Sequence, residues 1–159
     1  MKAVRCTAWG PPDSLVLEDL PEPVAGPGDV VVDVKAAGVN FPDLLIIQNK
    51  YQLKPPLPFT PGAELAGVIK EVGSGVGHLK AGDPVVAVVN TGAFAEECVA
   101  SATRVFALPA AVDFAAAAVL GLIVGLIKLF NRGGSVMAVP LPVIAATTVS
   151  TLVFLAIRH

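Results

Sequence analysis

Short apolar runs alternate with glycine and proline turns through the first 113 residues of this 159-residue chain. Many of these runs are rich in valine, and turns such as residues 81–84 separate them. Many short strands at close spacing favour a compact β-barrel or sandwich over repeated β-α units. The sequence therefore predicts a mainly β domain with some α over residues 1–113. The runs expected to be strands are 30–34, 66–72, 85–89, 94–100 and 104–108.

One helix is predicted inside this domain, beginning near Asn40. Pro42 suits a first helical turn, and the apolar residues 44–47 follow it. Asn40 is a residue type that caps helix N-termini, and Asp43 would lie at the positive end of the helix dipole. The proline-rich residues 55–62 cannot continue a helix or a central strand, so we expect them to be extended.

Composition excludes several classes of protein. The formal charge is −2 and the basic residues are scattered, which argues against nucleic-acid binding. Two cysteines, Cys6 and Cys98, cannot form a disulfide framework. The N-terminal residues lack the apolar core of a secretory signal. These observations predict a cytoplasmic setting.

The chain changes character after Asp113. Residues 114–130 are apolar apart from Lys128, and residues 135–157 carry no charge. We expect residues 114–159 to form apolar, helical segments. Two interpretations stay open: a truncated remnant of an interdomain helix and a β-α unit, or membrane-associated helices through residues 135–157. Exposed apolar surface on such a remnant would favour a homodimer.

Two segments carry a resemblance to a known family. Residues 61–76, beginning Pro-Gly-Ala-Glu-Leu-Ala-Gly, resemble the signature of the medium-chain dehydrogenase/reductase superfamily, and residues 36–43 resemble its matching active-site segment. Asn40 and Ala63 stand where the zinc enzymes of that superfamily keep a Cys and a His. Both replacements resemble the zinc-free quinone oxidoreductase (ζ-crystallin-like) branch. The resemblance implies a GroES-like, chaperonin-10-like β-barrel.

The resemblance also implies a function, which is NADPH-dependent reduction of a quinone or another activated carbonyl by hydride transfer. By analogy, Asn40 and Tyr51 are the candidate catalytic residues, and Asn40 and Asp43 the candidate contacts to NADPH. A catalytic zinc needs three protein ligands, and no cysteine or histidine here stands in a paired metal-ligand spacing, so no metal is expected. Glu64, a charged residue in an apolar run, is expected to anchor the fold through backbone hydrogen bonds.

The cofactor-binding half of such an enzyme is not evident in the sequence. A dinucleotide-binding domain needs a glycine-rich loop after its first strand, but residues 133–139 run into Pro140 and Pro142 instead. We therefore expect an incomplete oxidoreductase that is weakly active or inactive by itself. Two alternatives stay open, a non-catalytic binding module on the same fold and a protein anchored in a membrane through residues 135–157.

Overall fold

The computed structural model describes residues 1–109, 111–118 and 152–155. In these ranges strands are the main regular structure, with the α-helix α1 (Phe41–Ile47), a helical turn at residues 114–118, and two short 3-10 helices, η1 (Pro12–Ser14) and η2 (Ala102–Arg104). The strands are β1 (Lys2–Arg5), β2 (Val16–Asp19), β3 (Asp29–Val39), β4 (Glu64–Val72), β5 (Pro84–Val88), β6 (Glu97–Ser101), β7 (Val105–Ala107) and β8 (Leu152–Leu155).

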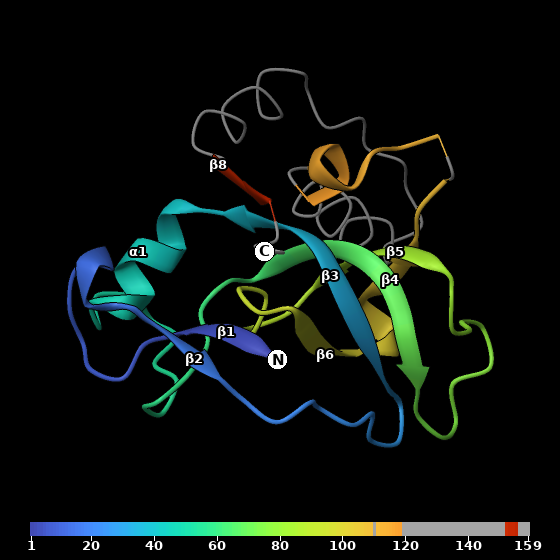
Figure 1. Ribbon diagram of the computed structural model, residues 1–159, viewed down its shortest axis with the longest axis horizontal. Coiled ribbons are helices and arrows are strands. Elements are labelled where there is room, and N and C mark those ends of the chain that lie inside the picture. Colours follow the sequence, from blue (N-terminus) through green and yellow to red (C-terminus); the bar gives the residue numbers. More distant parts are fainter. Residues whose placement is uncertain (110, 119–151, 156–159) are drawn as a thin grey trace.

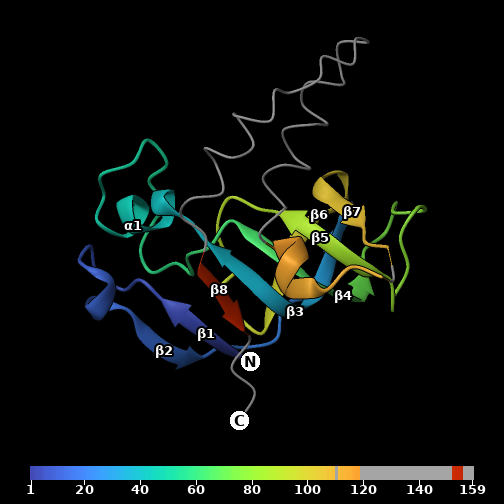
Figure 2. The same ribbon diagram turned by 90° about the horizontal axis from the view of Figure 1, so that it is seen from above.

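The main sheet is antiparallel and has the order β6-β3-β4-β5-β7, with β8 also paired to β3. Strands β3 and β4 run side by side across the molecule, and α1 follows directly from the end of β3 (Figure 1). A separate antiparallel hairpin, β1–β2, lies to one side of this sheet (Figure 2). The predicted mainly β architecture with some α is confirmed for the described part of the chain.

The interior forms against both faces of β3, which explains why its sequence is apolar almost throughout. Val30, Val32 and Val34 pack in the largest buried cluster with Leu65 and Ile69 of β4. On the other face, Ala36 and Ala66 contact Ala117 and Ala118, which belong to a helical turn at residues 114–118. Small side chains on both elements allow this close approach of helix and sheet.

The structure places most predicted elements where the sequence indicated them, with two differences. The run at 94–100 becomes a strand of the main sheet only at Glu97, because the Phe94 carbonyl and the Glu96 N–H bond to the hairpin. The Glu96 carbonyl already accepts from the Val34 N–H of β3 at 2.9 Å. The Val4 N–H donates to the Phe94 carbonyl at 2.9 Å, and the Glu96 N–H donates to the Lys2 carbonyl at 3.0 Å. The β1–β2 hairpin itself was not predicted, since its strands mix polar and apolar residues.

Most of the C-terminal tail lies outside the described residues, so the alternatives for 135–157 are not decided there. Residues 114–118 are helical, as expected. Residues Leu152–Leu155, which we expected to be helical, form a strand against Ala36–Val39. The prediction was wrong at these four positions, because the open edge of β3 supplies backbone partners that a helix would not use. No helix within the described ranges is long and apolar enough to cross a membrane.

Candidate active site

The candidate site begins where β3 ends and α1 starts. Asn40 occupies the N-cap position with extended backbone angles, φ −117° and ψ 157°. The Asp43 carboxylate accepts a hydrogen bond from the Asn40 N–H at 2.8 Å, and the Asp43 N–H donates to the Asn40 carbonyl at 3.0 Å. These reciprocal bonds satisfy orphan groups of the first turn. The predicted helix start and cap position are confirmed.

Glu64 completes a buried polar cluster, which we call the Asn40–Asp43–Glu64 cluster. The register of β3 and β4 places Glu64 opposite Gly38, two residues before Asn40. Its side chain is buried, and a hydrogen bond from the Asn40 side chain reaches its carboxylate. The contact is thus with a side chain and not with the backbone groups that we expected. Gly38 leaves the space, since a Cβ there would lie 3.2 Å from Glu64 Oε2.

Burial dominates the electrostatics of both carboxylates. Removal from water raises the pKa of Glu64, the Asn40 hydrogen bond opposes that change, and the negative charge of Asp43 adds to it. Removal from water also raises the pKa of Asp43, against backbone hydrogen bonds from Asn40 and Gly62 that favour its ionised form. Glu64 Oε2 has no hydrogen-bond partner among the described residues.

The cluster orients the Asn40 amide and leaves one of its N–H groups able to donate to a bound molecule. An ionised carboxylate only accepts hydrogen bonds, so the bond to Glu64 turns the Asn40 NH₂ group toward that residue. An amide nitrogen carries two N–H donors, and one bond to Glu64 uses one of them. Asn40 is only partly buried. Its remaining donor can therefore serve a polar oxygen of a bound molecule.

Tyr51 lies in the chain four residues beyond the end of α1. It is partly buried and packs against Cys6, Ile46, Ile47 and Phe59. The structure therefore brings Asn40 and Asp43 together directly. Tyr51 packs instead in an apolar cluster that includes Ile46 and Ile47 of α1. A catalytic role for Tyr51 stays a prediction.

The segment around Ala63 lies next to the start of α1, close to Asn40 and Asp43. Gly62 donates to Asp43 and Glu64 contacts Asn40, so both chain neighbours of Ala63 touch the cluster. In the part of the chain that the structure describes, no group of three or more His, Cys, Asp or Glu residues could hold a metal ion.

Sequence reasoning missed the part that Glu64 plays in this site. A carboxylate inside an apolar strand was the available signal, and it indicated that Glu64 needs a partner without identifying which one. Gly62 has a positive φ of 92°, which glycine adopts without strain, and its bond to Asp43 depends on tertiary structure.

Comparison with known families gives one match. Residues 26–110 match the alcohol dehydrogenase GroES-like domain. This range contains the Asn40–Asp43–Glu64 cluster and most of the main sheet.

Similar curated proteins include proteins named quinone oxidoreductase-like and homologs of the synaptic vesicle membrane protein VAT-1. The chain is 42% identical over 119 residues to rat quinone oxidoreductase-like protein 2, covering 75% of this chain and 33% of that protein. It is 40% identical over 137 residues to the mouse synaptic vesicle membrane protein VAT-1 homolog, covering 82% and 34%.

The chain is also similar in fold to solved oxidoreductase structures. The Escherichia coli quinone oxidoreductase complexed with NADPH superposes with a TM-score of 0.76 at 31% identity, over 86% of this chain and 42% of that one. The chain thus spans 33% to 34% of the length of the two curated relatives named above.

Proposed function

Because the chain belongs to the alcohol dehydrogenase GroES-like domain family, in the quinone oxidoreductase branch of the medium-chain dehydrogenase/reductases, we propose that it serves NADPH-dependent reduction. The proposed substrate is a quinone or another activated carbonyl compound. The chain would supply the catalytic-domain part of that activity. The observation that carries the proposal is the Asn40 amide, held by Glu64 at the end of β3 with one donor left for a ligand.

Each candidate residue has a role that its chemistry allows. Asn40 would donate its second amide N–H to the carbonyl oxygen of the acceptor, which stabilises charge that develops there. The Tyr51 hydroxyl would be a further donor at the same substrate. Asn40 and Asp43 would contact the nicotinamide end of NADPH. When bound, NADPH supplies the hydride.

The residues present suit the part of such a site that would bind the acceptor carbonyl. The Asn40–Asp43–Glu64 cluster offers a preorganised neutral donor, as a reaction at a carbonyl requires. A glycine-rich phosphate loop is not evident in the sequence, and the chain spans 33% of the rat relative's length. We therefore propose that NADPH binds weakly to this chain. A cytoplasmic setting and a homodimer belong to the same proposal. The two buried cysteines, Cys6 and Cys98, are free, which is compatible with a reducing compartment.

The proposal is tested by NADPH oxidation with a small quinone, followed by absorbance, together with the thermal midpoint with and without NADPH. We expect weak quinone-dependent oxidation and a measurable rise in the midpoint. Asn40→Ser keeps a residue that caps helices well but removes the amide, so turnover should fall by about tenfold or more while the fold persists.

A matched variant separates packing from chemistry at Tyr51. Tyr51→Phe keeps the ring in its apolar cluster and removes only the hydroxyl, so a fall in turnover without a fall in thermal midpoint would support a chemical role. If the unaltered chain shows neither oxidation nor a shift in midpoint, the activity does not reside in it.

A further inference from the structure

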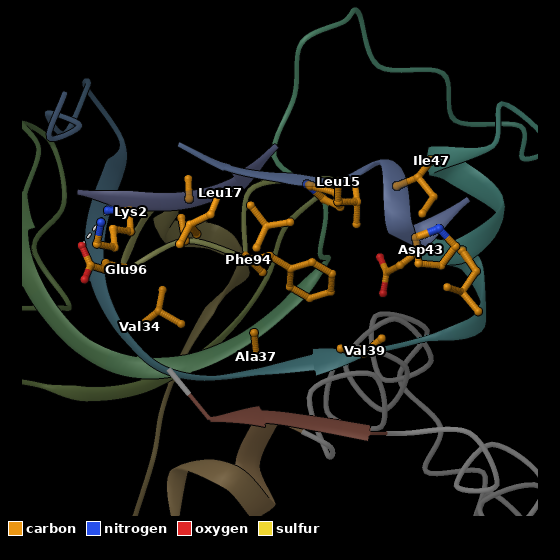
Figure 3. Close-up of a pocket in the computed structure, with 17 residues that line it drawn as sticks. Lys2, Leu15, Leu17, Val34, Ala37, Val39, Asp43, Ile47, Phe94 and Glu96 are labelled. Carbon is orange, nitrogen blue, oxygen red and sulfur yellow. Dashed lines mark hydrogen bonds between the residues drawn. The ribbon is translucent and has the colours of Figure 1, made fainter. Parts of the chain in front are cut away.

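An apolar cavity of approximately 380 Å³ lies between the hairpin and β3 (Figure 3). Its volume falls within the roughly 300–1,000 Å³ of small-molecule sites, which are mostly apolar with few polar groups. It borders the Asn40–Asp43–Glu64 cluster only through Asp43, so it is distinct from the proposed position of the carbonyl. Its apolar lining includes Leu15, Leu17, Val34, Ala37, Val39 and Phe94.

The polar groups of the cavity are concentrated at its two ends (Figure 3). At one end, the Lys2 backbone N–H donates to Glu96 Oε2 at 2.7 Å. The Lys2 ammonium group also lies 3.4 Å from the Asp19 carboxylate. This end of the cavity therefore holds a lysine charge close to its carboxylate groups.

The opposite end carries unmatched negative charge. The Asp43 carboxylate points into the cavity beside the Phe94 ring (Figure 3), and its side chain is buried. Glu64 adds a second buried carboxylate near it. Among the described residues, no ion pair joins either carboxylate to a Lys, Arg or His. A carboxylate has about four acceptor positions, and two backbone donors leave Asp43 further capacity.

Gly62 holds the two groups of this end together. It donates its N–H to Asp43, and a side chain on Gly62 would overlap the Phe94 ring. An aromatic ring beside a carboxylate is an arrangement that attracts an organic cation, since both the ring face and the carboxylate are negative.

We propose that this cavity binds a small primary ammonium compound with an apolar body, its N–H groups donating to Asp43 beside Phe94. The apolar body occupies the space between Leu17 and Ala37. This site shares Asp43 with the proposed NADPH contact, but binding of the ammonium compound does not require NADPH.

The test is a titration of the whole 159-residue chain, without NADPH, followed by the NMR signals of the valine and alanine methyl groups. The probes are benzylamine, benzyl alcohol, toluene and benzoate, which share one ring and differ in charge and donors. We expect benzylamine to shift Val34, Ala37 and Val39 and to bind about tenfold more tightly than benzyl alcohol. Benzoate should not bind.

Two variants assign the effect to the site. Asp43→Asn should abolish the preference for benzylamine over benzyl alcohol, whereas Glu96→Gln, at the other end of the cavity, should preserve it. Because Asp43 also holds the start of α1, Ala37→Leu provides a test that leaves the carboxylate in place. It fills the cavity, so the affinity for both benzylamine and benzyl alcohol should fall.

Several outcomes would overturn the proposal. Equal affinity for benzylamine and toluene would show that only apolar contact matters. A preference for the amine that survives in Asp43→Asn would place the cation elsewhere. Shifts outside the cavity, or unchanged affinity in Ala37→Leu, would show that benzylamine binds at another surface. The titrations contain no NADPH, so their outcome does not depend on whether the chain reduces a quinone.

Discussion

Asp43 and Glu64 are two carboxylates that this fold keeps out of water. Burial is the largest effect on each, and it raises the pKa of both. A raised pKa means that the folded state binds a proton more readily than the unfolded chain does. Each residue therefore stabilises the fold less when ionised, and its contribution improves as pH falls through its raised pKa toward the unfolded value.

This electrostatic argument predicts a pH dependence for Glu64→Gln. The substitution removes the buried charge but keeps an oxygen that can accept from Asn40. Relative to the unaltered chain, the variant should have its greatest advantage in free energy of unfolding near neutral pH. That advantage should shrink as pH falls toward about 4.3, the ordinary pKa of Glu. Urea unfolding at a series of pH values measures it.

Glu22 provides a control of opposite sign. Its hydrogen bond and charge interaction with Lys70 lower the pKa of that exposed carboxyl. Its contribution is therefore present above the unfolded pKa and lost as pH falls, so Glu22→Gln should be most costly near neutral pH. If Glu64→Gln shows the same direction as Glu22→Gln, the buried carboxylate is stabilising and our account of it is wrong.

At the scale of elements, the junction between the proline-rich segment and β4 positions the site. Gly62 has a φ of 92°, bonds to Asp43 at the start of α1, and lies against Phe94. One residue thus links α1, β4 and the segment before β6. A side chain at Gly62 would disturb all three, because both the backbone angle and the space exclude it.

Gly62→Ala should lower the free energy of unfolding by about 3 kcal/mol, from the left-handed backbone conformation and the collision with Phe94. Gly75→Ala is the matched control. Gly75 also has a positive φ, 82°, but open space around the position of a Cβ. It should lose only about 1 kcal/mol, the cost of the backbone conformation. Equal losses in chemical denaturation would contradict the role of Phe94.

At the scale of the whole molecule, one strand organises most of the structure. β3 pairs with β4 on one edge and with β6 and β8 on the other, and its residues enter buried clusters on both faces. Leu65, on β4 opposite Ala37, is completely buried in the largest cluster. The stability of the described domain should therefore depend strongly on this central pair of strands.

Leu65→Ala should lower the free energy of unfolding by about 2–5 kcal/mol, because it removes buried contacts and leaves a cavity. Leu17→Ala is the same chemical change at a side chain that is 54% exposed, and should cost less than about 1 kcal/mol. Urea unfolding of both variants measures the difference. Similar losses would mean that the core is not organised around β3 and β4.

Local sequence was sufficient for the runs that became β3, β4 and β5, and for the start of α1 at Asn40. Their signals are short-range: valine-rich runs, Gly-Pro turns, and a capping residue before Pro42. The hairpin β1–β2 could not be found in this way. Its strands are stabilised by pairing with each other and by contacts to Phe94 and Glu96, which no local pattern encodes.

The candidate site, too, was determined partly by local sequence and partly by tertiary structure. Residue types and their order along the chain determined the family resemblance, the helix start and the choice of Asn40 and Asp43. Only the tertiary structure brought Glu64 to Asn40 and Gly62 to Asp43, and opened a cavity beside Phe94. The physical reason is that a cap or a turn depends on neighbouring residues, whereas burial of a carboxylate and the shape of a cavity depend on which strands pair and in what register.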